Sequence, residues 1–285
     1  MTRDLDRHGR AEPVGRAREV ARLRGLIGDP PPGTVIALIS GEAGIGKTTL
    51  VNYVVAGRFA AGDRVLRGSA DERDTARFSL WRPVLRDLGV ALPHADASVG
   101  AADQIDELAA VVGDSLGTGS WRLVVLEDLH WADEASLILL RLVAERLVGH
   151  PVLVVATVRT GASHRDALTR LMTQAEPILL SGVSPADIAS IAASVNGEVL
   201  TSTEASALHR MTGGNPLLVR GLLAVEDNRL SIAANQLLTR AIEQLGAPTA
   251  NVLSVFALAG ATAPAAAITA IAASGEGTRG TAASK

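Results

Sequence analysis

The sequence contains no cysteine, which removes a whole set of chemistries. Disulfide bonds, thiolate metal sites and cysteine nucleophiles are excluded for all 285 residues. Aromatic residues make up only 2% of the chain, so a core must be built from Leu, Val, Ile and Ala. The net charge of −3 gives no overall attraction to nucleic acid or to an anionic membrane.

Lysine is also scarce. Of 27 basic residues, only Lys47 and Lys285 are lysines, so an internal lysine suggests a task that arginine cannot perform. Hydrophobic residues make up 47% and charged residues 20%, which is typical of a globular protein. The N-terminal residues are charged and lack the apolar segment of a signal peptide, so we expect a cytoplasmic protein.

Short apolar runs alternate with helical patterns over the first 180 residues. This alternation predicts an α/β fold with a parallel sheet flanked by helices. We expect strands at 34–40, about 63–70, 122–128, 151–159 and 177–180. We expect helices at 14–27, 48–60, within 78–89, at 102–112 and at 134–148.

The pattern changes after residue 181, where strand signals end. Ser184 and Thr201 each begin a capping-box pattern, and a break at 213–216 precedes a third helical stretch. A fourth helix is expected at 235–245, so residues 181–245 are predicted to form a small helical domain. The uncharged run 244–275 predicts two short packed helices, with a membrane span as the alternative.

A phosphate-binding loop is predicted where "GEAGIGKT" follows an apolar strand and opens a helix. Its glycines let successive backbone N–H groups converge on phosphate oxygens, aided by the positive end of the helix dipole. Lys47 is expected on the β- and γ-phosphates of ATP, Thr48 on Mg²⁺, and Glu42 in solvent. The predicted binding residues are Gly41, Glu42, Ala43, Gly44, Ile45, Gly46, Lys47, Thr48 and Thr49.

A pair of adjacent acids ends the strand "LVVLED", about 80 residues after the loop. Successive strand residues point to opposite faces, so Glu127 and Asp128 need not occupy one location. In most P-loop proteins of this class the metal-binding acid comes first. We therefore expect Glu127 to hold Mg²⁺ through water and Asp128 to orient the attacking water. The alternative is an acidic strand end in solvent. Asp133 is expected to cap the next helix.

Five motifs in order carry a family resemblance: "VGRAREVARL", "GEAGIGKTTL", "LEDLHWADEAS", "VVATVR" and "MTGGNPLLV". Together they resemble the nucleotide-binding part of STAND ATPases, and more narrowly that of large ATP-binding LuxR-type (MalT-like) regulators. The resemblance spans about residues 13–260. It implies ATP or ADP with Mg²⁺ as ligands, strand order 5-1-4-3-2, and a helical lid after the sheet.

The resemblance also implies roles for residues outside the loop. Val14, Gly15 and Arg16 would lie near the adenine, Arg159 would meet the γ-phosphate as a sensor, and Pro216 would contact the nucleotide from the lid. It further implies domains at 1–180 (ATPase), 181–245 (lid) and 246–285 (a truncated winged-helix-like segment and flexible tail). Glu127 departs from the wider class of P-loop proteins, which prefers Asp at that position.

The leading functional hypothesis is an ATP-binding, slowly hydrolysing switch that acts on a protein partner or by self-association in the ATP state. A nucleotide-binding module that does not hydrolyse ATP is one alternative. An AAA-type initiator or loader acting on DNA is another, but no recognition helix with a basic face is evident. We expect no membrane association.

Overall fold

The computed structural model describes residues 12–28, 36–60, 64–92, 100–118, 121–150, 152–161 and 166–223. The strands are β1 (Ile36–Gly41), β2 (Arg64–Ser69), β3 (Trp121–Glu127), β4 (Leu153–Arg159) and β5 (Glu176–Leu179). The helices are α2 (Ala17–Gly28), α3 (Lys47–Ala60), α4 (Arg82–Leu88), α5 (Ala101–Thr118), α6 (Glu134–Arg146), α7 (Asp166–Gln174), α8 (Pro185–Val195), α9 (Ser202–Thr212) and α10 (Pro216–Leu223), with 3-10 turns at Ser79–Trp81 and Leu129–Trp131. The chain divides into two compact units, Met1–Arg220 and Gly221–Lys285.

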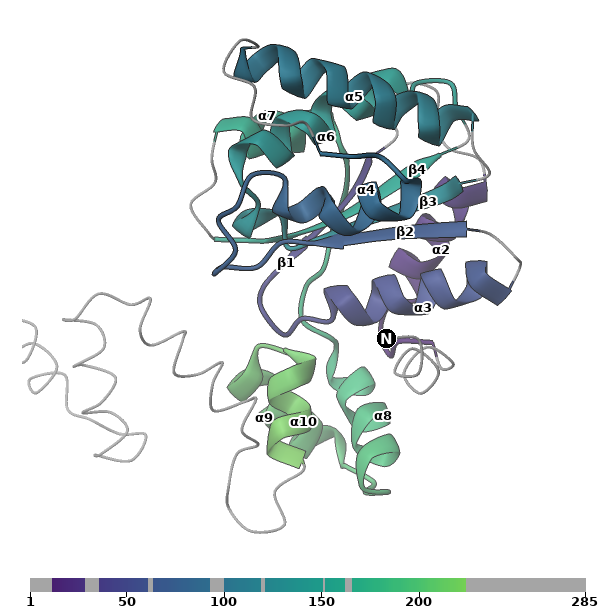
Figure 1. Cartoon of the computed structure of the whole chain (residues 1–285). Coiled ribbons are helices and arrows are strands. Elements are labelled where there is room, and N and C mark those ends of the chain that lie inside the picture. The colour runs from purple at the N-terminus through teal and green to yellow at the C-terminus, as the bar shows by residue number, and fades with distance from the viewer. Residues whose placement is uncertain are drawn as a thin grey trace, which may run out of the picture. The chain divides into compact units, whose positions relative to one another are not determined.

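The five strands form one parallel sheet in the order β2-β3-β4-β1-β5, which confirms the predicted order (Figure 1). β1 lies between β4 and β5, and its last residue, Gly41, lies opposite Arg159 at the end of β4. Because the strands are parallel, the carboxyl ends of β1, β3 and β4 meet at one edge of the sheet. The predicted phosphate loop, acid pair and sensor arginine therefore all begin at that edge.

Both faces of the sheet are covered, which explains why its strands are apolar at nearly every position. Alternate strand residues such as Val124 and Val154 face one core, which α4, α5, α6 and α7 cover. Their neighbours Val125 and Val155 face the other core, which α2 and α3 cover. Figure 1 shows α5, α6 and α7 on one side of the sheet and α2 and α3 on the other.

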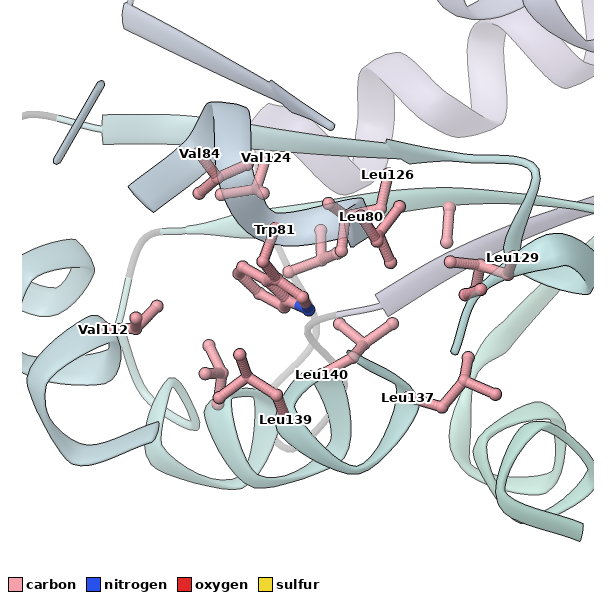
Figure 2. Close-up of a cluster of buried hydrophobic side chains, with 14 of the residues drawn as sticks. Leu80, Trp81, Val84, Val112, Val124, Leu126, Leu129, Leu137, Leu139 and Leu140 are labelled. Atoms are coloured by element: carbon pink, nitrogen blue, oxygen red, sulfur yellow. The ribbon is translucent and has the colours of Figure 1, made fainter. Parts of the chain in front are cut away.

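The larger core has Trp81 at its centre (Figure 2). Its indole is fully buried, lies between the side chains of β3 and those of α6, and donates a hydrogen bond to the carbonyl oxygen of Ser136 at 3.0 Å. One large ring thus fills a space that a core of Leu, Val and Ile would otherwise need several side chains to fill. An indole ring is stable in an apolar core when its N–H has a hydrogen-bond partner, as it has here in Ser136.

Both predicted capping boxes are confirmed in the helical segment α8–α10, drawn in green in Figure 1. Ser184 caps α8 and exchanges hydrogen bonds with Asp187, and Thr201 caps α9 and exchanges them with Glu204. Each box satisfies two backbone N–H groups that a helix start leaves open. The local sequence therefore sets where these helices begin.

Two helices differ from their predicted bounds by three residues or more. α2 begins at Ala17 rather than at residue 14, because the chain turns at Gly15 (φ +71°) and Arg16 donates its N–H back to Pro13. α5 continues to Thr118 rather than ending at 112. Gly113 lies inside α5, and a Cβ there would come within 3.0 Å of the Arg146 side chain on α6. This glycine serves close helix packing and does not end the helix.

Several predictions fall outside the described residues: the helix at 235–245, the packed helices or membrane span at 244–275, and the tail. Within the residues that the structure describes, no helix is both long and apolar enough to cross a membrane. The three-domain division at 180 and 245 stays a prediction.

Candidate phosphate-binding active site

The phosphate loop connects β1 directly to α3. Gly44 and Gly46 adopt φ values of +76° and +104°, a region that favours glycine because a side chain would clash there. A Cβ added to Gly46 would meet nothing within 4 Å, so the loop is open at this position. Glu42 is exposed, as predicted.

Lys47, the first residue of α3, extends over the loop. Its Nζ donates to the carbonyl oxygens of Gly41 and Glu42, both at 2.8 Å. Burial lowers the pKa of Lys47, Asp128 opposes that shift and Arg159 adds to it. These charge interactions mean that Asp128 and Arg159 lie near Lys47, while the predicted roles of the three residues toward ATP stay predictions.

Glu127 ends β3 and faces α3. Burial raises the pKa of its carboxyl group, while the charge of Arg67 and a hydrogen bond with the Thr48 side chain oppose the rise. Arg67 lies on β2 opposite Val125, so it shares a face of the sheet with Glu127. Its Nη2 donates to Asn52 Oδ1 at 2.6 Å, which fixes the guanidinium against α3. Sequence reasoning missed Arg67 and Asn52.

Asp128 lies just past the strand in a left-handed conformation, with φ 60° and ψ 45°. This turn breaks the strand alternation, and the Asp128 carboxylate interacts with the charge of Lys47. Burial raises the pKa of the Asp128 carboxyl group, and Lys47 opposes the rise. Its backbone N–H donates to the hydroxyl of Thr157 at 2.9 Å, and that residue is only 1% exposed. Thr157 thus holds the turn that aims Asp128.

Arg159 ends β4 beside the first residue of the phosphate loop. The next residue, Thr160, donates its N–H to the Gly41 carbonyl oxygen at 3.2 Å, so the end of β4 is tied to the start of the loop. Thr157 lies two residues before Arg159 on β4, and strand alternation puts the side chains of Thr157 and Arg159 on one face of the sheet. This spacing is the signal that could have predicted Thr157 from the sequence.

Arg16 lies against the outside of the phosphate loop and is only 4% exposed. Its Nη2 donates to the carbonyl oxygens of Ile45 at 3.0 Å and Ser181 at 2.7 Å. Burial lowers the pKa of Arg16, and the charges of Glu19 and Asp187 oppose that shift. Val14 is half-buried and Gly15 is exposed beside it. Their predicted adenine contact stays a prediction.

The turn 213–216 also reaches the loop, through a residue that sequence reasoning did not select. Asn215 donates from Nδ2 to the carbonyl oxygen of Ala43 at 2.9 Å, and its Oδ1 accepts the N–H of Leu217 at 3.1 Å. Pro216 is half-buried as the first residue of α10. Asn215 has no sequence signal beyond its place in "GGNP", because its partner lies 172 residues away.

Asp133 caps α6 as predicted, since its side chain accepts the N–H of Ser136 at 2.9 Å. It also accepts the N–H of Phe78 at 3.2 Å, from a residue in a left-handed conformation (φ 61°). The cap therefore fixes the segment before α4 as well. His130 packs against Trp131, with ring centroids 4.9 Å apart.

Thr48 and Glu127 offer a fitting site for Mg²⁺. The ion prefers oxygen ligands, usually one or two from protein with the rest from water and phosphate. A hydroxyl and a carboxylate that already contact each other beside an open phosphate loop match that preference. Among the described residues, no group of three or more His, Asp or Glu side chains forms a larger cage.

The family model of an AAA ATPase domain matches residues 12–155. Among solved structures, the replication initiator DnaA bound to AMPPCP and single-stranded DNA is 15% identical, with a TM-score of 0.50 over 89% of this chain and 73% of that one. The Orc1 protein of Aeropyrum pernix in complex with DNA is 13% identical, with a TM-score of 0.52 over 95% and 79%.

At these identities the two structures show a shared fold and nothing more. A search of curated proteins gives no match. The family model covers about half of the chain, from the segment before α2 to the middle of β4, and so includes the phosphate loop and the acid pair. The chain belongs to the AAA ATPase domain family.

Proposed function

We propose that the chain is an ATP-binding, slowly hydrolysing switch of the STAND type, related to LuxR-type regulators, which acts on a protein partner. The observation that carries the proposal is the meeting of Lys47, the Thr48–Glu127 pair, Asp128 and Arg159 at one edge of the sheet. The resemblance in sequence supports the narrower assignment and the slow rate.

Each residue has a role that follows from its position. Lys47 places a compact charge on the β- and γ-phosphates, and Arg159, electrostatically coupled to it, adds a second charge at the γ-phosphate. Asp128, aimed by its turn, accepts a hydrogen bond from the attacking water and orients it. Thr48 and Glu127 would hold Mg²⁺, which would supply charge neutralisation at the phosphates.

The lid role is supported by direct contacts from the segment after the sheet. Ser181 is bound by Arg16, and Asn215 binds Ala43 in the phosphate loop. A displacement of 181–223 therefore changes the contacts of the loop that holds the nucleotide. We propose that a protein partner, or a second copy of the chain in the ATP state, reads that displacement.

ATP binding and turnover test the proposal with three variants. We expect Lys47→Ala to lose ATP affinity. We expect Asp128→Asn to keep binding and to lose about 10²-fold or more in turnover, the usual contribution of a positioned acid or base. Glu134→Gln, at an exposed acid in the first turn of α6, is the control and keeps both.

Two results would contradict the proposal in different ways. Retained ATP affinity in Lys47→Ala would remove the phosphate site. Equal background turnover in the unmodified protein and Asp128→Asn, with ATP still bound, would favour the nucleotide-binding module that does not hydrolyse ATP. Light scattering with ATP and with ADP tests self-association.

DNA binding is the second candidate, because both initiators named above were solved with DNA. The net charge of −3 opposes it, since affinity for DNA comes largely from phosphate contacts with Lys and Arg. Fluorescence anisotropy with single-stranded and duplex DNA, with ATP and at two salt concentrations, decides between the candidates. Salt-sensitive binding would favour an initiator.

A further inference from the structure

Two side chains hold the phosphate loop from outside, by its carbonyl oxygens. Asn215 donates to Ala43 O at 2.9 Å, and Arg16 donates to Ile45 O at 3.0 Å. Both donors are buried, at 6% and 4% exposure, so water competes little for these bonds. The two contacts fall on alternate peptide units of the loop, 43–44 and 45–46.

Peptide geometry makes these contacts relevant to phosphate. In a planar trans peptide, the C=O of one residue and the N–H of the next point in opposite directions. A bond that holds the Ala43 carbonyl outward therefore turns the Gly44 N–H inward, and the Ile45 carbonyl does the same for the Gly46 N–H. Inward N–H groups on such a loop are the donors that bind phosphate oxygens.

Glycine makes the external bonds necessary. Gly44 and Gly46 adopt positive φ, and glycine crosses between positive and negative φ at little cost. A loop with such residues can rotate its peptide units, which would direct carbonyl oxygens toward the phosphates. Hydrogen bonds from Asn215 and Arg16 select the orientation in which the N–H groups face inward.

We infer that Arg16 and Asn215 are positioning residues that set the phosphate affinity of the loop and make that affinity depend on the segment 181–223. Arg16 also binds Ser181, before α8, and Asn215 precedes α10 with its amide oriented by Leu217 N–H. Movement of that segment withdraws Asn215 from Ala43 and removes the Ser181 carbonyl oxygen that also holds Arg16. The inference rests on the proposed ATP binding and says how these two contacts act on the peptide units of the loop.

The test uses variants that remove the contact and spare the rest. Asn215→Ser keeps an oxygen able to cap α10 but is too short to reach Ala43. Arg16→Lys keeps the charge but replaces the guanidinium fork by a single ammonium group. Thr201→Ala is the matched control, because it removes the cap of α9, in the same segment, without touching the loop.

Binding of ATP and of inorganic tripolyphosphate, both with Mg²⁺, is measured by calorimetry. We expect each test variant to lose about tenfold in affinity for both ligands, as for one lost hydrogen bond, while Thr201→Ala keeps the unmodified affinities. A loss confined to ATP would place the effect at the adenine and overturn the inference. So would unchanged tripolyphosphate affinity.

Amide hydrogen exchange separates this inference from the proposed function. In protein without nucleotide, the peptide covering 41–48 should exchange faster in Asn215→Ser and Arg16→Lys than in the unmodified protein or in Thr201→Ala. Equal exchange in all four proteins would overturn the inference whatever the ligand is. Failure of the unmodified protein to bind ATP would overturn the proposed function alone.

Discussion

Replacing Gly182 by alanine should destabilise the segment that carries α8–α10. A Cβ at this position would lie 2.0 Å from the carbonyl oxygen of Gly213. A carbon–oxygen contact normally lies at about 3.3 Å or more, so the two backbone segments must separate by about 1.3 Å. Val183 N–H donates to Gly214 O at 2.8 Å beside this contact, and such a separation breaks that bond.

The cost follows from the groups left without partners. Val183 and Gly214 are buried, so each loses its hydrogen bond where water cannot replace it. At about 1–3 kcal/mol for each of the two unsatisfied groups, the substitution should lower the free energy of unfolding by about 2–6 kcal/mol. ATP affinity should fall too, since Asn215 follows Gly214 directly.

Urea unfolding, followed by circular dichroism, measures the stability change, and calorimetry measures ATP affinity. Gly25→Ala is the control: Gly25 is exposed inside α2, and a Cβ there meets nothing within 4 Å. That substitution should stabilise the protein by about 0.5–1 kcal/mol. An unfolding midpoint for Gly182→Ala at or above that of the unmodified protein would refute the reasoning.

Three further predictions concern the core, a cap and the acid pair. Trp81→Phe loses the indole bond to Ser136 and leaves a small void, and should lower the free energy of unfolding by about 2 kcal/mol in urea. Asp133→Ala removes the cap of α6 and the acceptor for Phe78 N–H, and should cost about 2–3 kcal/mol by the same assay. Glu127→Gln should raise the melting temperature in EDTA without nucleotide at neutral pH, with a gain that shrinks in mild acid.

The sign of the last effect follows from linkage. Burial raises the pKa of Glu127 in the folded protein, so the folded chain binds that proton more tightly than the unfolded chain. The stability this provides is complete below the ordinary carboxyl pKa of about 4 and is lost as pH rises through the raised pKa. A melting difference independent of pH would contradict it.

The other two predictions have their own controls. Asp133→Asn keeps an oxygen for the cap and for Phe78, and should unfold close to the unmodified protein; a loss equal to that of Asp133→Ala would contradict the assigned contacts. For Trp81→Phe, an unchanged midpoint would mean that the bond to Ser136 contributes nothing.

The sequence was sufficient for elements that local physics determines. The phosphate loop has glycine, lysine and threonine in a fixed order between an apolar strand and a helix, so the loop and the two elements that flank it could be predicted. The strand order was right because it came with the family resemblance. The starts of α8 and α9 were right because Ser184 and Thr201 satisfy neighbouring N–H groups through contacts three residues away.

What could not be predicted depends on residues that meet only after folding. The helix α5 continues through Gly113 because α6 packs against it, and nothing in the local sequence reports that contact. Asn215 contacts Ala43 of the phosphate loop from the turn before α10, and Arg67 on β2 contacts Asn52 of α3. The left-handed turn at Asp128 is held by Thr157 from another strand; its spacing from Arg159 could mark Thr157 as a site residue, but not the turn that it holds.

The two outer contacts of the phosphate loop also bear on which segments of the chain must be kept together for nucleotide binding. A fragment cut to the sheet alone would contain every residue of the nucleotide motif and still lack Arg16 on one side and Asn215 on the other. A chimera of this chain and a relative should therefore keep nucleotide affinity only when the segments that carry Arg16 and Asn215 come from the same parent as the phosphate loop.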